Sequence, residues 1–217
     1  MYFCHPSKQL QQAFALKPYQ GIAPELAQYL FVGLDANYDK NIEFQSVFVQ
    51  ILEYLKDGVT FWRKNNVHHP FLLSHYKGDG QFFHKSFARI GFGTEHAEKV
   101  SFVELLHVPT YGRSSLVLDD LDHAHLDRIN HAIMFGAARH IFIPSGVARL
   151  MRLTGLFSWM PRNPLGTRDG LDVWYKSESK VVYSHYHFSV FGKFEQRKQA
   201  QLRAMRLLVP DIDDTFS

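Results

Sequence analysis

The chain has 217 residues, 46% of them apolar and 21% charged, which is typical of a globular protein of one large domain or two small ones. No run approaches the roughly 20 apolar residues of a membrane span. The amino terminus, MYFCHPSKQLQQ, lacks the order of a secretory signal, so we expect a cytoplasmic protein without a membrane partner. A single cysteine, Cys4, excludes an internal disulfide and any zinc or iron–sulfur site built on several thiolates. The net charge of +3 agrees with a polyanion partner without requiring one.

Apolar runs and turn residues predict strands that alternate with helices. In chain order, we expect a strand at 29–32, a helix over 43–57 ending at Gly58, an irregular segment at 65–81, a helix at 82–92, a strand at 99–109, a helix at 119–135, a strand at 139–144, a helix at 147–153, a loop at 158–170, strands at 171–176 and 180–185, and a basic helix at 193–208.

This alternation predicts an α/β fold in three α/β/α layers, with a central, mostly parallel four-stranded sheet. We expect one domain over residues 1–217, with its core at about 28–208. The loops that leave parallel strands gather along one edge of the sheet. These loops span 33–39, 107–113, 144–146 and 185–193, and they bring together carboxylate, histidine and serine side chains. The turn at Ser145 and Gly146 begins a helix, where backbone N–H groups can hold a phosphate.

Four segments, in this order, are similar to the motifs of one family. The segment GLDANY at 33–38 is similar to a strand end of the form Gly-Gln-Asp-Pro-Tyr, and SHYHFS at 184–189 is similar to a later His-Pro-Ser-Pro motif. Phe71 with GDGQFFHKSFARIGF at 78–92 is similar to a stacking aromatic followed by a helix, and IFIPSG at 141–146 to a strand before a Gly-Ser phosphate loop. Together they resemble the uracil-DNA glycosylase superfamily over roughly residues 28–208.

The resemblance implies a glycosylase that flips a damaged base out of DNA and hydrolyses its bond to the sugar, leaving an abasic site. Asp35 would orient the attacking water and stabilise the sugar cation, and His185 would donate a hydrogen bond to the departing base. The base pocket would comprise Gly33, Leu34, Phe71 and His107. The DNA contacts would come from Ser145, Gly146, His187, Ser189, Phe191, Lys193 and Arg197. Neither a cofactor nor a metal is expected, and the protein would bind DNA as a monomer.

Two departures from the family pattern leave the excised base open. Leu34 stands where the family has Gln, and His107 stands where it commonly reads uracil with an Asn. An imidazole offers one donor and one acceptor in a geometry different from that of a carboxamide. The base could therefore be uracil or another deaminated or modified base.

Alternatives remain for each feature. Asp35 could be an ordinary turn residue that bonds to its own backbone, and Phe71 could simply fill the core. The basic residues at 193–208 could form a solvent-exposed helix face without a ligand. Pairs of histidines could bind a metal, at His68-His69, at His123 and His125, or at His185 and His187. The protein could also be a DNA-binding module of the same fold that has lost catalysis, or a hydrolase of free nucleosides or another small substrate.

Overall fold

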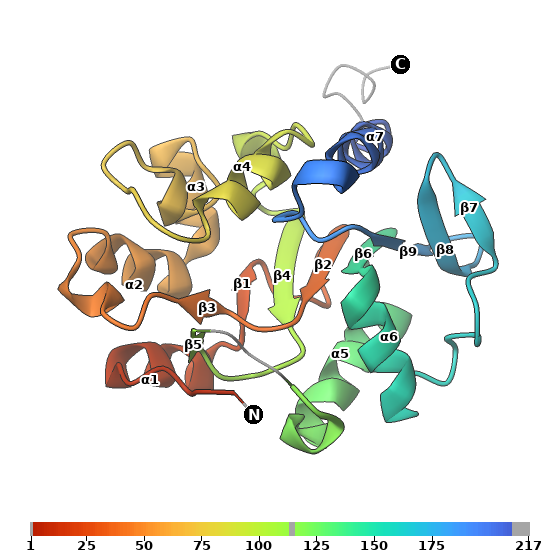
Figure 1. The fold of residues 1–217 in the computed structure, drawn as a ribbon, viewed down its shortest axis with the longest axis horizontal. Coiled ribbons are helices and arrows are strands. Elements are labelled where there is room, and N and C mark those ends of the chain that lie inside the picture. The colour runs from red at the N-terminus through yellow and green to blue at the C-terminus, as the bar shows by residue number, and fades with distance from the viewer. Residues whose placement is uncertain (1, 113–115, 210–217) are drawn as a thin grey trace.

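The computed structural model describes residues 2–112 and 116–209, which form a sheet with helices on both faces (Figure 1). The sheet contains seven strands in the order β1-β4-β2-β6-β9-β8-β7. The prediction of four strands was therefore wrong in number, although the four central strands, β4, β2, β6 and β9, are parallel to one another. The strands are β1 (Tyr19–Gly21), β2 (Tyr29–Gly33), β4 (Val100–Glu104), β6 (His140–Pro144), β7 (Gly166–Arg168), β8 (Leu171–Lys176) and β9 (Val181–His185).

The outer strands add antiparallel pairs to the parallel centre. β1 pairs antiparallel with β4, β8 pairs antiparallel with β9, and β7 pairs antiparallel with β8. A separate pair of short parallel strands, β3 (Asn37–Tyr38) and β5 (Thr110–Tyr111), continues beyond the ends of β2 and β4.

The two faces of the sheet carry different side chains because successive residues of a strand point to opposite sides. In β2, Leu30 and Val32 face the cluster that includes α5 and α6, whereas Tyr29 and Phe31 face the cluster that includes α3, α4 and α7. A third apolar cluster joins α1, α2 and the β3 region. The helices are α1 (Lys8–Leu16), α2 (Phe48–Lys56), α3 (Gly58–Asn65), α4 (Gln81–Ala88), α5 (His123–Phe135), α6 (Ser145–Thr154) and α7 (Glu195–Arg206).

Several predicted boundaries differ from those observed. Gly58 does not end a helical segment but begins α3, because the Asp57 side chain accepts a hydrogen bond from the Thr60 N–H and caps this second helix. The strand predicted at 99–109 ends at Glu104, the residue paired with Gly33 at the end of β2. The loop predicted at 158–170 includes β7. No helix within the described part of the chain is long and apolar enough to cross a membrane.

Candidate active site at the carboxyl edge of the sheet

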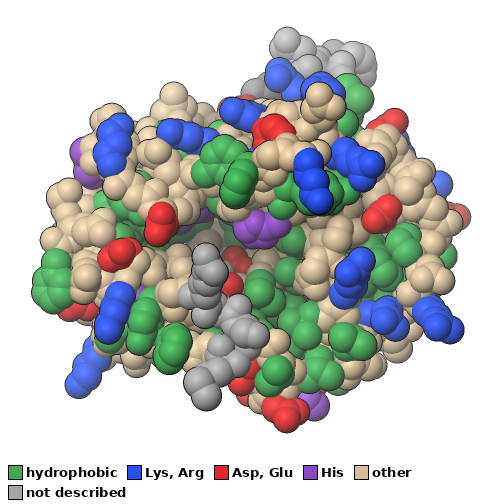
Figure 2. All heavy atoms as spheres, viewed as in Figure 1, with side chains coloured by type: hydrophobic (Ala, Val, Ile, Leu, Met, Phe, Trp, Pro, Cys, Tyr) green, Lys and Arg blue, Asp and Glu red, His purple; other side chains and the backbone are tan. Residues whose placement is uncertain are grey.

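A cleft of about 1290 Å³ lies at the carboxyl ends of the parallel strands. Asp35, Ser145 and His185, predicted to share one site, all line it. Figure 2 shows this face hollowed near its centre, with histidine and acidic side chains inside and Lys and Arg side chains above and to the right. Ligands of open α/β sheets characteristically bind at this edge, so the cleft is the candidate active site.

Asp35 is held in place by the segments that follow β2 and β4. The Thr110 N–H donates to the Ala36 carbonyl at 2.9 Å, so the two segments run together beyond the sheet. The Thr110 hydroxyl donates to the Asp35 carboxylate, and Asn37 Nδ2 lies 3.4 Å from the same oxygen. Asn37 is itself fixed by the Gly112 carbonyl at 2.8 Å. The Asp35 carboxylate therefore has a defined position at the mouth of the sheet.

Glu104 is a second carboxyl group in the cleft, and the sequence did not single it out as a site residue. It ends β4 opposite Gly33, where a methyl group on Gly33 would overlap the Glu104 carboxylate. Glycine at position 33 therefore leaves the space that this carboxyl group occupies. Burial, together with the nearby Asp35 carboxylate, raises the pKa of Glu104 to about 8. The local signal was a lone acidic residue inside the apolar run VSFVELLHV.

We expect Glu104 to make stability depend on pH. In the unfolded chain the Glu104 carboxyl group has a pKa near 4.5, whereas in the folded protein its pKa is about 8. Between these two pH values the folded state binds more protons than the unfolded state, so the free energy of unfolding falls as the pH rises through this window. Glu104→Gln should reduce that fall. The measurement is the free energy of unfolding in urea near both ends of the window, with the exposed Glu43→Gln as control. An unchanged pH dependence in Glu104→Gln would contradict the raised pKa.

His185 ends β9 and is 2% exposed. Its Nδ1 lies 2.7 Å from the Tyr186 carbonyl oxygen, which can only accept, so Nδ1 carries the proton. Burial lowers the pKa of His185 to about 3, and the ring is neutral near pH 7. Its Nε2 is then an acceptor. With its one ring proton on Nδ1, His185 does not offer an N–H to a departing base in this arrangement, so its role as that donor stays a prediction that this tautomer does not support.

His187 has the opposite hydrogen-bonding pattern. Its Nδ1 accepts from the Ser189 N–H at 3.2 Å, which leaves Nε2 to carry the proton of the neutral ring. Desolvation lowers the pKa of His187, while the Asp35 carboxylate acts in the opposite direction. His187 lines the cleft beside Phe83, with ring centroids 5.3 Å apart. The cleft thus receives an N–H donor from His187 and an acceptor from His185.

The amino end of α6 also borders the cleft. Ser145 begins this helix directly after β6, and its hydroxyl donates to the His185 carbonyl at 3.1 Å. Among the described residues, none outside the helix and its adjoining positions lies within 4 Å of a Cβ built on Gly146, so this side of the helix start is open to them. The first N–H groups of a helix have no partner within it, and they attract anions. Both predicted residues, Ser145 and Gly146, line the cleft.

Of the four residues predicted to bind the base, three line the cleft and one does not. Gly33, Leu34 and Phe71 line the cleft. Phe71 is only 3% exposed and stacks on Tyr76 with centroids 4.3 Å apart, so it also belongs to the core. His107 is not among the described residues that line the cleft. The reason is that β4 ends at Glu104, and the His107 ring lies 5.7 Å from that of His125 in α5.

The remaining residues that were predicted to contact DNA belong to the loop after β9 and to the basic helix α7. Ser189 lines the cleft, whereas Phe191 is 78% exposed and, like the exposed Lys193, is not among the described residues lining it. Arg197 donates to the Tyr186 hydroxyl at 3.3 Å and lines a neighbouring pocket.

Lys198 is a buried member of the basic helix, for which a solvated face was one alternative. It is 1% exposed, and its Nζ donates to the carbonyls of Phe188 and Val190 at 3.3 and 2.6 Å. It also pairs with Glu195 at 2.9 Å. Lys198 therefore holds the backbone of the loop that follows His185, and it is not available to a ligand.

Within residues 2–112 and 116–209, no group of three or more His, Cys, Asp or Glu side chains is placed to hold a metal ion. His68 and His69 instead pack with His84, whose ring lies 3.6 Å from that of His69 and nearly parallel to it. No family model matches the chain, and no curated protein matches it either.

Proposed function

We propose that the protein is a DNA base-excision glycosylase of the uracil-DNA glycosylase type, which hydrolyses the bond between a flipped damaged base and its sugar. The observation that carries the proposal is the placement of Asp35, Glu104 and two histidines of opposite hydrogen-bonding character at one sheet edge. The parallel order β4-β2-β6-β9 and the open start of α6 support it further. DNA is the partner expected from the mild positive charge and the basic residues beside the cleft.

The chemistry needs negative charge near the sugar and donors near the departing base. Cleavage of a glycosidic bond passes through a cationic sugar, which the fixed carboxylate of Asp35 would stabilise. The base leaves with negative charge, which an N–H or a protonated carboxyl group can stabilise by donating a hydrogen bond to it. His187 and the protonated Glu104 could supply these hydrogen bonds. In this scheme Asp35 also orients the attacking water.

The hydrogen-bonding pattern constrains the base. His185 Nε2 as an acceptor favours a base that presents an N–H, and Glu104, when protonated, offers one donor and one acceptor. Uracil, hypoxanthine and xanthine each present an N–H beside a carbonyl. Phe83 lines the wall against which such a base would stack, and the buried Phe71 supports that wall from the core.

The test is incubation of the purified protein with oligonucleotides that carry uracil, hypoxanthine, xanthine or an alkylated base, followed by alkaline cleavage at abasic sites. We expect cleavage with at least one lesion. Binding without cleavage of any substrate would favour the catalytically silent DNA-binding module.

Phe191 is expected to act on duplex DNA. Its exposed ring, on the loop held by Lys198, can fill the gap that a flipped base leaves in the stack. Phe191→Ala should therefore slow excision from duplex substrates more than from single strands. The matched control is Phe135→Ala, because Phe135 is 77% exposed at the end of α5, on the opposite edge of the sheet. Equal slowing on both substrates would contradict this role.

One observation favours a second candidate, a hydrolase of free nucleosides. Asp35, Asp39, Asp79 and Glu104 all line the cleft, and this much acid disfavours a phosphate deep inside it. A nucleoside carries no phosphate. Release of base from nucleosides, without DNA binding or activity on oligonucleotides, would make this candidate the better account.

A further inference from the structure

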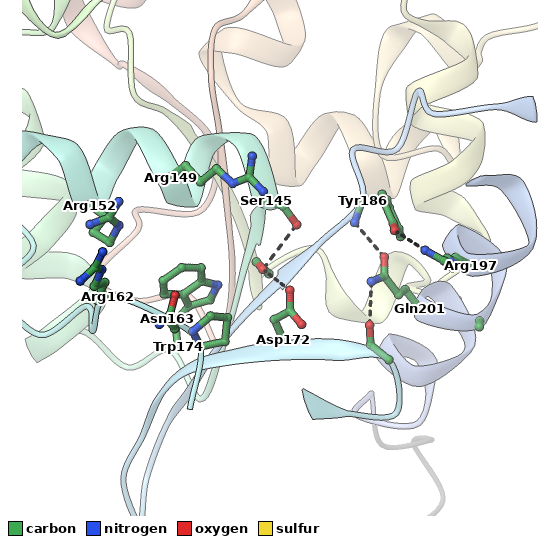
Figure 3. A pocket seen from close by; sticks show the side chains of 14 residues that line it. Ser145, Arg149, Arg152, Arg162, Asn163, Asp172, Trp174, Tyr186, Arg197 and Gln201 are labelled. Atoms are coloured by element: carbon green, nitrogen blue, oxygen red, sulfur yellow. Dashed lines mark hydrogen bonds between the residues drawn. The ribbon is translucent and has the colours of Figure 1, made fainter. Parts of the chain in front are cut away.

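A second pocket of about 740 Å³ adjoins the cleft (Figure 3). Arg149, Arg152 and Arg162 lie on one side of it, while Tyr186, Arg197 and Gln201 lie on the other. Asp172 and Trp174 lie between the two sides. Ser145, Arg149 and Tyr186 line both cavities, so the pocket is continuous with the candidate active site.

The spacing of residues along α6 explains part of this lining. Ser145, Arg149 and Arg152 follow one another at intervals of four and three residues, which places them on one face of the helix. Val147, Ala148 and Met151 are buried in the cluster on the other face. Arg162 comes from the loop before β7, and Arg197 comes from α7. Three segments distant in sequence thus direct arginines into one pocket.

The described residues only partly offset the positive charge of this pocket. Within the described ranges, none of the four arginines forms an ion pair. Asp172 is the single acidic residue among the described lining residues, and it lies 3.5 Å from the Ser184 hydroxyl. Four arginines against one aspartate leave an excess of three positive charges. Guanidinium groups gathered without carboxylate partners form a site for an anion, and their fork geometry suits phosphate.

Trp174 adds a donor of the same kind. The indole lines the pocket and is 6% exposed, and its Nε1 has no hydrogen-bond partner in the part of the chain that the structure describes. A buried N–H is normally paired, so this donor is suited to a ligand acceptor.

We propose that this arginine pocket binds internal phosphodiester groups of the DNA strand whose nucleotide enters the cleft. This inference rests on the proposed function, because the ligand must be a nucleic acid strand that passes both cavities. The shared residues Ser145 and Arg149 place such a strand along α6, with its bases toward the acidic cleft and its phosphates toward the arginines. The arrangement also separates the strand's negative charge from Asp35 and Glu104.

The experiment measures DNA affinity as a function of salt concentration for the wild type and the double variant Arg152→Gln/Arg162→Gln. Undamaged duplex oligonucleotides are used, so that no catalysis is needed. The control is Arg63→Gln/Arg139→Gln, which removes the same charge from the opposite edge of the sheet, where Arg63 pairs with Glu98 and Arg139 precedes β6. Circular dichroism and urea unfolding confirm that each variant is folded.

We expect the slope of log affinity against log salt to fall by about 1.8 in the pocket variant, since each lost phosphate contact contributes about 0.9. The control should keep the wild-type slope. An unchanged slope in the pocket variant, or an equal loss in both variants, would overturn the proposal. Absence of DNA binding by the wild type would overturn it as well.

Two further arms identify the phosphate source. Oligonucleotides with and without a 5′-phosphate should bind equally, and a preference for the phosphorylated end that disappears in the pocket variant would overturn the internal phosphodiester in favour of a terminal phosphate. Inorganic phosphate that binds the pocket more tightly than DNA does would overturn it in favour of a free anion. A reduced slope without base release from any lesion would leave the pocket supported and the glycosylase rejected.

Discussion

Asp35→Asn is expected to lower the rate of base release by at least about a hundredfold while leaving DNA affinity close to that of the wild type. The substitution keeps the shape of the side chain and its contacts with Thr110 and Asn37, but it removes the negative charge that would stabilise the sugar cation. Single-turnover rates on the lesion that the wild type processes best, together with equilibrium binding, separate the two effects.

Asp39→Asn is the matched control, because this second aspartate lies four residues further along the chain, directly after β3, and also lines the cleft. Its carboxylate accepts the Asn41 N–H at 2.8 Å, a turn interaction that an asparagine side chain can also make. We expect near wild-type rates. Equal losses in Asp35→Asn and Asp39→Asn would indicate a general effect of cleft charge, and an active Asp35→Asn would remove Asp35 from the mechanism.

Lys198→Met is expected to lower the free energy of unfolding by about 2 kcal/mol, because it removes the buried donor on which two backbone carbonyls depend. These are the carbonyls of Phe188 and Val190. The contact with Glu195 adds less, since that side chain is 35% exposed and also lies 3.9 Å from Arg89. The loop that carries His187 and Ser189 should loosen too, so base release should fall. Urea unfolding and hydrogen exchange over residues 186–191 are the measurements.

Lys193→Met provides the comparison, since Lys193 belongs to the same basic segment but is exposed. Its Nζ lies 5.0 Å from the centroid of the neighbouring Phe194 ring, a contact of small energy at the surface. We expect less than about 0.5 kcal/mol of change in stability. A Lys198→Met protein as stable as the wild type would show that the buried amine does not hold the loop.

Local sequence patterns predicted the central strands well because each is a short apolar run that ends at a turn. β2, β6 and β9 lie where YLFV, RHIFIP and KVVYSH predicted strands. The edge strands β1 and β7 were missed, since each has only three residues and depends on a neighbour for its pairing. α3 was missed because Gly58 more often ends a helix than begins one.

Residues of the candidate site could be predicted where their place in the local sequence was itself informative. Residues that reach the site only because distant segments pack together were missed. Asp35 stood out by its place after an apolar strand. Glu104 was hidden because the run continued to Val108, and only the pairing of β4 with β2 ends the strand at that residue. The burial of Lys198 and the clustering of Arg149, Arg152 and Arg162 arise from tertiary packing, which charge patterns along the chain do not contain.

The most direct test of the central claim is the reaction in water enriched in heavy oxygen, with products resolved by mass spectrometry. The proposed hydrolysis predicts free base without the label and an abasic strand that carries it at the sugar, with both products reduced at least about a hundredfold in Asp35→Asn. Intact oligonucleotides from every lesion substrate, under conditions in which the wild type binds DNA, would contradict glycosylase activity at this cleft.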